Sequence, residues 1–329
     1  MRTTNNYIMR RKKRRASAAT RYRNRVLWTS LIAAAVVLCL LITVNSSLKL
    51  PFFPTWESIY SDLGLHSPPL PDGQLRVTVL DVGNADSILL ESGGKFALID
   101  AGEDNDETDV IACLENAGVT ELEYVIATHP DTDHVGGMDA VIRHFPIRTF
   151  LMSFMPKGYT PTTRTYENLL DALSERELTP VKAVYEDSYI FGNATLTILS
   201  GFREYTETND QSVICQVSHG EMDFLFMGDA GKEVEQDLLK IRPLLDVEVL
   251  KVGHHGSQSS SNGSFIRCVS PEIAVITCGY NNPYRHPHTE TLKTLQRNEA
   301  RIYRTDLSGR IVLTSDGKSV SVSTEKEAQ

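Results

Sequence analysis

Short apolar runs alternate with amphipathic segments through most of the chain. Runs rich in branched and aromatic residues predict short strands. The main runs lie at 75–83, 87–92, 95–102, 123–127, 222–228, 247–253 and 272–279. Apolar positions at helical spacing predict helices at 108–118 and 231–240. Helices mixed with both hairpins and crossover strands predict two packed sheets with helices outside them.

Residues 26–44 form a separate pattern, a continuous apolar run without a charged side chain. At about 1.5 Å of rise per residue, such a helix is about long enough to cross the hydrocarbon core of a bilayer. Ten Lys and Arg residues lie within 1–25, and basic flanks stay in the cytoplasm. The pattern predicts a basic cytoplasmic tail, one transmembrane anchor and a C-terminal domain outside the cell. A cleaved signal peptide is the alternative, although its apolar core is usually shorter.

Residues 45–74 contain five prolines and no clear periodicity, which predicts a linker before a folded domain at 75–329. Ten of the 33 basic residues lie in the tail, and all 42 acidic residues lie after it. The remainder of the chain therefore has a net charge of −19. A body this acidic offers no broad basic surface, which argues against tight nonspecific binding of nucleic acid. The five cysteines form no CxxC pair, so nothing supports a zinc knuckle.

Residues 128–137 read THPDTDHVGG and directly follow a predicted strand. Their candidate metal ligands are His129, Asp131, Asp133 and His134. Imidazole with carboxylate is the ligand mixture that suits a first-row divalent metal. The competing interpretation is that the acidic residues only cap a helix and the histidines lie on the surface.

Three further motifs place acids or histidines at predicted strand ends. Asp229 follows the strand-like part of MDFLFMGDAG, the pair His254 and His255 follows VLKVG, and His286 and His288 lie in NNPYRHPH. Six of the nine histidines therefore fall in motifs that could converge on one site. Of the other three, His66 is interpreted as a linker residue, His144 as part of the polar end of a helix, and His219 as an exposed hairpin tip.

The motifs HxDxDHxGG, GDAG, HHGS and NxPYxHPH, opened by LDVGNADSILL and LIDAG, resemble the metallo-β-lactamase fold. They are most similar to the hydrolase domain of the ComEC/Rec2 competence proteins, over about residues 75–315. The resemblance does not extend to the many-helix channel of those proteins, so DNA translocation is not implied.

The resemblance implies a four-layer αββα sandwich with two divalent metal ions, zinc or manganese, at the sheet edges. By motif, His129 and Asp131 bind the first metal, Asp133 and His134 bind the second, and Asp229 bridges them. The resemblance also implies that His255 is a ligand of the second metal and that its neighbour His254 orients the substrate or a ligand. His286 and His288 would contact the substrate or donate a proton. The choice between His254 and His255 stays open.

Two departures from the family pattern matter. Asp131 stands where the commonest motif has a histidine, and residues 208–212 read TNDQS where a third-motif histidine is expected. Asn209, Asp210 or water could fill that place. More oxygen atoms make the ligand set of the first metal chemically harder, which weakens the assignment of zinc and allows manganese or iron.

These features predict metal-dependent hydrolysis of a phosphodiester outside the cell, with DNA or a cell-envelope phosphoester as substrate. The expected partners are that phosphoester and the membrane, while the oligomeric state stays open. A lactam, lactone or thioester hydrolase on the same fold is one alternative. A tethered binding or sensor module without turnover is the other, because the third-motif histidine is missing.

Overall fold

The computed structural model describes residues 27–45, 54 and 68–326, and the chain forms two compact units, Met1–Pro68 and Pro69–Gln329. The proposed tail at 1–25 and most of the proposed linker lie outside the described residues. Within the first unit, Leu27–Asn45 is a helix of 19 residues that is long and apolar enough to cross a membrane. These bounds differ by one residue at each end from those expected from the sequence.

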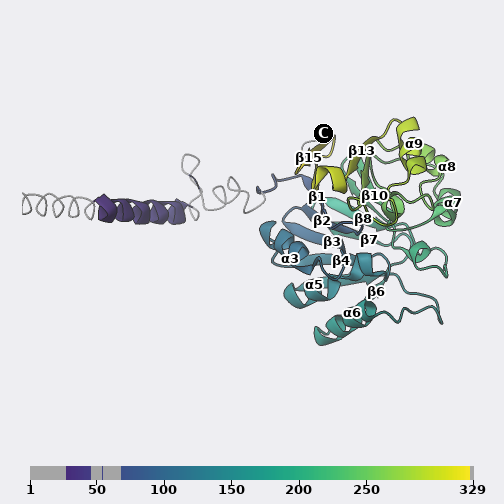
Figure 1. The fold of residues 1–329 in the computed structure, drawn as a ribbon, viewed down its shortest axis with the longest axis horizontal. Coiled ribbons are helices and arrows are strands. Elements are labelled where there is room, and N and C mark those ends of the chain that lie inside the picture. The colour runs from purple at the N-terminus through teal and green to yellow at the C-terminus, as the bar shows by residue number, and fades with distance from the viewer. Residues whose placement is uncertain (1–26, 46–53, 55–67, 327–329) are drawn as a thin grey trace, which may run out of the picture. The chain divides into compact units, whose positions relative to one another are not determined.

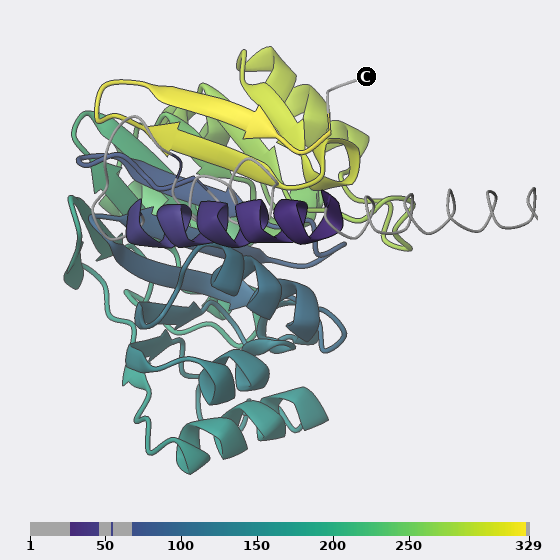
Figure 2. The same ribbon diagram turned by 90° about the vertical axis from the view of Figure 1, so that its left-hand side faces the viewer.

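The second unit contains two β-sheets in its described part (Figure 1). The larger sheet has the strand order β15-β14-β1-β2-β3-β4-β5-β6. Its strands are β1 (Leu75–Val79), β2 (Ser87–Ser92), β3 (Lys95–Ala101), β4 (Leu122–Ala127), β5 (Ile147–Met152), β6 (Val181–Lys182), β14 (Ile311–Ser315) and β15 (Val320–Thr324). The hairpin of β14 and β15, yellow in Figure 2, extends this sheet beyond β1 through antiparallel pairing.

The smaller sheet has the strand order β13-β12-β11-β10-β9-β8-β7. Its strands are β7 (Ser188–Phe191), β8 (Ala194–Ile198), β9 (Cys215–His219), β10 (Met222–Phe226), β11 (Val249–Lys251), β12 (Ile273–Ile276) and β13 (Arg301–Arg304). Strands β10 to β13 run parallel, as β3, β4 and β5 do in the larger sheet. Parallel strands bring the loops that follow them to one edge, where the candidate ligands lie.

Helices cover the outer face of each sheet (Figure 1). Those on the larger sheet are α3 (Glu107–Asn116), α4 (Thr132–Val135), α5 (Met138–His144) and α6 (Arg164–Glu175). Those on the smaller sheet are α7 (Lys232–Ile241), α8 (Gly263–Val269) and α9 (Thr289–Arg297), and the short α10 (Thr305–Ser308) follows β13. The layers are therefore helix, sheet, sheet, helix, which confirms the expected αββα sandwich.

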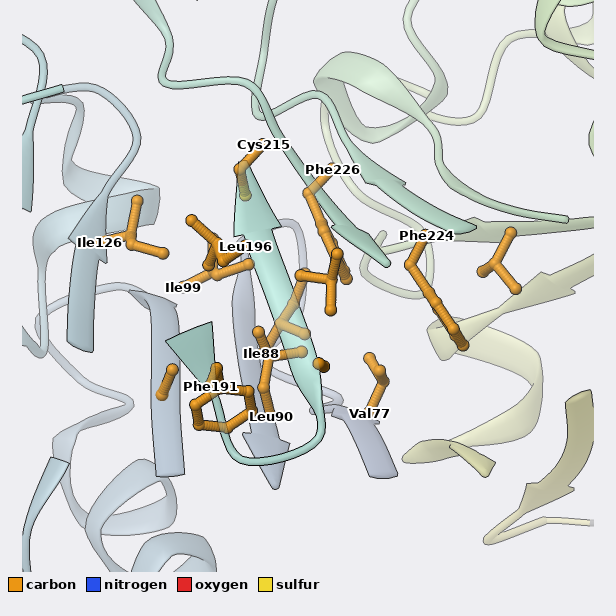
Figure 3. Close-up of a cluster of buried hydrophobic side chains, with 14 of the residues drawn as sticks. Val77, Ile88, Leu90, Ile99, Ile126, Phe191, Leu196, Cys215, Phe224 and Phe226 are labelled. Carbon is orange, nitrogen blue, oxygen red and sulfur yellow. The ribbon is translucent and has the colours of Figure 1, made fainter. Parts of the chain in front are cut away.

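The core lies between the facing surfaces of the two sheets (Figure 3). Alternate residues of the larger sheet point inward, among them Val77 and Ile88, and pack with Leu196 and Phe224 of the smaller sheet. Each side chain of this size contributes roughly 1.5–3 kcal/mol when it is fully buried. This core holds the two sheets together, so the loops at their shared edge have a rigid support.

His219 contradicts the expectation of an exposed hairpin tip. It is the last residue of β9, it is 3% exposed, and its Nδ1 lies 2.9 Å from Ser315 Oγ. Its Nε2 donates to the carbonyl oxygen of Gly73 at 3.0 Å. The expectation failed because the tip of this hairpin packs against the other sheet instead of facing solvent.

Candidate metal centre

Four of the expected ligands gather at the carboxyl ends of the parallel strands. Asp133, His134, Asp229 and His255 place one ligand atom each within 4.8 Å of all the others. They come from α4, from the loop after β10 and from the short 3₁₀ helix η2 (Gly253–Gly256) after β11. Residues more than a hundred positions apart in sequence thus form one cluster.

His129 and Asp131 lie beside this cluster. The His129 ring is 4.0 Å from the His134 ring, centroid to centroid, and its Nε2 is 3.8 Å from Asp131 Oδ2. Asp131 occupies the N-cap position of α4 with extended backbone angles but makes no capping hydrogen bond through its side chain. The capping interpretation therefore does not explain this carboxylate.

The glycine pair of the THPDTDHVGG motif has a steric role. A Cβ atom on Gly136 would lie 2.2 Å from the backbone carbonyl carbon of Glu103, which is closer than any side chain permits. The chain that leaves α4 can therefore pass the loop after β3 only with glycine at this position. This close approach keeps the ligands of α4 next to the end of β3.

The HHGS histidines have an unusual backbone. His254 and His255 have φ values of 49° and 50°, both in the left-handed region. Such conformations cost of order 1–3 kcal/mol for a residue with a side chain, and they cluster at functional sites. The two rings consequently diverge, with planes 80° apart and centroids 6.1 Å apart.

Hydrogen bonds turn the Nε2 atoms of the buried histidines inward. His134 Nδ1 donates to Asp100 Oδ2 at 2.7 Å, and His255 Nδ1 donates to the carbonyl oxygen of Thr277 at 3.0 Å. A carboxylate and a carbonyl only accept, so Nδ1 carries a hydrogen, and in the neutral ring Nε2 presents a lone pair. Outer hydrogen bonds of this kind orient metal-ligating histidines.

His129 is oriented in the same way. Its Nδ1 lies 3.1 Å from Thr128 Oγ1, whose hydroxyl donates to Asp100 Oδ2 at 2.7 Å and therefore accepts from the ring. Among the described residues, the buried atoms without a hydrogen-bond partner include Nε2 of His129, His134 and His255 and Oδ1 of Asp229. Inward lone pairs beside a carboxylate fit a divalent cation, and imidazole with carboxylate suits such an ion chemically.

The pKa values show how strongly the cluster attracts positive charge. Burial alone raises the pKa of Asp229, but the His255 and His134 rings outweigh it and lower that pKa well below its usual range. Burial disfavours protonated His134, yet Asp229 and Asp100 raise its pKa well above the usual value. His129 differs from the other two, because burial lowers its pKa to about 3 and keeps its ring neutral. The carboxylates thus favour a cation between them.

A buried ion pair that the sequence did not reveal supports His255. Lys251 Nζ lies 2.9 Å from Asp86 Oδ2, and each side chain is 2% exposed. The other oxygen of Asp86 accepts from the Thr277 hydroxyl and lies 3.5 Å from His255 Nδ1. Asp86 and Asp100 stand in the opening LDVGNAD and LIDAG motifs, so their acidic side chains at strand ends were the available signal.

The HPH pair divides between two environments. The His286 ring lies 5.5 Å from that of His254 and is stacked by the Tyr284 ring at 5.6 Å, and burial lowers its pKa to about 4. His288 Nδ1 instead accepts the backbone N–H of Gln258 at 3.1 Å. His286 therefore faces the cluster, whereas His288 is engaged with the loop after η2.

A cavity of about 410 Å³ opens beside the cluster. Its walls include Asp229, His254 and Asn209, with Lys232 as the single cationic residue among those that line it. Its other acidic residues are Glu207, Asp210 and Glu233. This cleft gives solvent and small molecules access to one side of the candidate metal centre.

The αββα sandwich, with acids and histidines converging where its parallel strands end, is the arrangement of the metallo-hydrolase class. Residues 80–280, more than half of the chain, match the Metallo-beta-lactamase superfamily. The chain therefore belongs to this superfamily of metal-dependent hydrolases, and the expected resemblance is confirmed at the level of the family.

Curated relatives connect the chain with competence proteins. It is 29% identical over 262 residues to ComE operon protein 3 of Bacillus subtilis (strain 168), covering 74% of this chain and 33% of the relative. It is 30% identical over 245 residues to competence protein ComA of Neisseria gonorrhoeae, covering 73% and 32%. It is 28% identical over 242 residues to recombination protein 2 of Haemophilus influenzae, covering 72% and 28%. The chain thus spans about a third of the length of these relatives.

Proposed function

We propose that the chain hydrolyses phosphodiesters with two divalent metal ions. The observation that carries this proposal is the Asp229 carboxylate, whose two oxygens face different histidines. Oδ1 lies 3.3 Å from His134 Nε2, while Oδ2 lies 3.6 Å from His254 Nε2. A single carboxylate shared in this way suits a bridge between two cations, an arrangement used by phosphoesterases.

The ligands sort into two sets around this bridge. We assign His129 and Asp131 to one cation, and Asp133, His134 and His255 to the other. The cations, manganese, zinc or iron, would neutralise the charge of a phosphodiester and polarise its phosphorus–oxygen bonds. The buried hydrogen bonds from Asp100 and Thr277 would keep the imidazoles oriented throughout.

His286 is positioned to hydrogen-bond a substrate oxygen beside the centre. Its backbone N–H donates to Asn282 Oδ1 at 2.9 Å, and Asn282 Nδ2 donates back to the His286 carbonyl at 2.7 Å. This reciprocal pair fixes the loop, and the Tyr284 ring stacks on the imidazole. Fixed side chains of this kind orient a bound substrate for reaction.

The charge of the cleft favours a small or locally held substrate. Four carboxylates and one lysine line it, so a long polyanion would meet repulsion outside the metal ions. DNA and a cell-envelope phosphoester are the two substrate classes that we propose. With the Leu27–Asn45 helix as an anchor, the domain would act on the outer side of the cell membrane.

The test uses the full chain purified in detergent and loaded with Mn²⁺ or Zn²⁺. We expect turnover of bis(p-nitrophenyl) phosphate, and hydrolysis of single-stranded DNA as the discriminating substrate. Asp133→Asn is the matched control, because it keeps the side-chain shape and removes one charged ligand. Hydrolysis of nitrocefin without hydrolysis of any phosphodiester would replace the proposal with a lactam hydrolase. A metal-loaded protein without any turnover would support a binding module.

A further inference from the structure

The first metal position lacks the histidine that the third family motif would supply. The corresponding segment is the 3₁₀ helix η1 (Asn209–Gln211), and two of its side chains are engaged elsewhere. Asp210 Oδ1 accepts the Gly231 N–H at 2.9 Å, and Gln211 Oε1 accepts the Tyr205 N–H at 2.7 Å. The third side chain, Asn209, faces the ring of His254, so this segment directs no side chain at the ligand cluster itself.

Asn209 lies against His254 and not against the ligand cluster. Its side-chain amide nitrogen is 3.3 Å from His254 Nδ1 and 3.5 Å from Nε2. The hydroxyl of Thr208 lies between this amide and Asp131, 3.3 Å and 3.4 Å away respectively. The segment that lacks the histidine therefore borders both His254 and the first-metal residue Asp131.

The hydrogen bonds of His254 direct its Nε2 toward the bridge. Its Nδ1 lies 3.0 Å from Ser259 Oγ, and that hydroxyl donates to Ser257 Oγ at 3.0 Å. Ser259 therefore accepts from the ring, so Nδ1 carries the hydrogen and Nε2 has the lone pair. The Asn209 amide nitrogen only donates, so in this tautomer it makes no hydrogen bond to Nδ1 and packs against the ring. The Nε2 lone pair faces Asp229 Oδ2 at 3.6 Å, too far for a hydrogen bond.

The distance suits a shared cation. Two ligand atoms that bind one metal at about 2.0–2.2 Å, in near-tetrahedral geometry, are roughly 3.3–3.6 Å apart. His255 Nε2 has a similar relation to the other oxygen, at 3.6 Å from Asp229 Oδ1. The consecutive left-handed residues thus direct adjacent imidazoles to opposite oxygens of one carboxylate.

We propose that His254 is the protein ligand that completes the first metal position in place of the absent third-motif histidine. Ser259 positions its ring through Nδ1, and Asn209 packs against the same ring. This inference rests on the proposed function, because it requires a centre with two cations. It also settles the roles of the HHGS pair, since His254 serves the first position and His255 the second.

The two positions then differ in exposure. The side chains of Asp131 and His254 are 41% and 26% exposed, and His254 lines the cleft. His134 and His255 are 0% and 1% exposed. The first metal would therefore border the substrate cleft through Asp131 and His254, while the second would lie between two buried imidazoles and the Asp133 carboxylate, which is 30% exposed.

The experiment measures metal content and affinity of the full chain in detergent, loaded with Mn²⁺ or Zn²⁺, by elemental analysis and competition with a chelator. We expect two ions in the unaltered protein and one in His254→Ala, with the weaker of the two affinities lost. His286→Ala is the matched control, because its ring is adjacent but belongs to neither set of ligands, and it should retain two ions. Asn209→Ala should keep both ions with a 10–100-fold weaker first affinity.

Folding is checked by circular dichroism, and His254→Gln is used if His254→Ala does not fold. Two ions held with unaltered affinity in the His254 variant would overturn this inference and leave the proposed function intact. Loss of both ions would also overturn it, because His254 would then serve the whole centre. An unaltered protein that binds no metal under any condition would overturn the inference and the proposed function together.

Discussion

Buried histidines occur at both ends of the sandwich, and their hydrogen bonding differs. At the end that includes β9 and Gly73, both ring nitrogens of His219 have partners, Ser315 and Gly73. At the opposite end, His134 and His255 have a partner at Nδ1, while Nε2 has none among the described residues. A buried polar atom is costly without a partner, so the first arrangement stabilises the fold and the second is suited to a ligand.

Asp229→Asn should have the largest effect, because it weakens the carboxylate that both sets of ligands share. The stabilisation of transition-state charge by the cations amounts to several kcal/mol, so turnover of bis(p-nitrophenyl) phosphate should fall by about 10³-fold. His219→Ala is the comparison variant, and its turnover per folded molecule should stay near that of the unaltered protein. Equal losses in the two variants would remove the distinction between the two ends.

Lys251→Met tests the buried ion pair beneath His255. Removing one partner of a buried pair costs about 3–5 kcal/mol, because the Asp86 carboxylate is left uncompensated. Urea unfolding should therefore show a large loss of stability. The double variant Asp86→Asn with Lys251→Met should recover part of that loss; a double variant less stable than the single one would show that the pair is not the source of the effect.

His219→Ala should lower the free energy of unfolding by about 2–4 kcal/mol. It leaves the Ser315 hydroxyl and the Gly73 carbonyl without their partner and opens a cavity between the sheets. The measurement is urea unfolding, with metal content per folded molecule determined in parallel. Loss of metal without loss of stability would contradict a structural role for this histidine.

The buried carboxyl group of Glu235 should make the free energy of unfolding depend on pH, independently of the metal centre. Burial raises its pKa to about 7, although the Ser261 and Asn262 N–H groups oppose the shift. The folded chain then binds this proton more tightly than the unfolded chain does. The protonated carboxyl group therefore contributes to the stability of the fold fully at pH values below the unfolded pKa, and this contribution is lost as pH rises through 7. Between pH 5.5 and 8, the loss in the free energy of unfolding amounts to about 2 kcal/mol.

Urea unfolding of the unaltered protein and of Glu235→Gln at these two pH values isolates this contribution. The glutamine variant cannot titrate here, so its stability should fall less between pH 5.5 and 8. If both proteins lose stability equally, the carboxyl group of Glu235 does not hold a proton in the folded state.

The layers and most of the site could be predicted because their signals are local. Strands appear as apolar runs, and THPDTDHVGG carries four candidate ligands within six residues. The structure brings Asp229, His255 and His286 to the same edge, as strand-end placement suggested. The metal-binding roles of these residues stay predictions until metal is measured.

Long-range partners could not be predicted from local pattern. The Thr277 hydroxyl donates to Asp86, 191 positions earlier, and His219 reaches Gly73, 146 positions earlier. Nothing near His219 in the sequence shows that its hairpin packs on the other sheet. The orientation of the HHGS rings likewise depends on backbone angles and on Ser259 and Thr277, which the motif alone does not determine.

The central claim is a two-cation centre bridged by Asp229, and counting metal ions in the full chain and in Asp229→Asn tests it most directly. Elemental analysis after equilibration with Mn²⁺ or Zn²⁺ should give two ions per chain in the unaltered protein. The variant should hold at most one, because its neutral amide is a poor bridge between two cations. A single ion in the unaltered protein, or two ions in both proteins at equal affinity, would contradict the account.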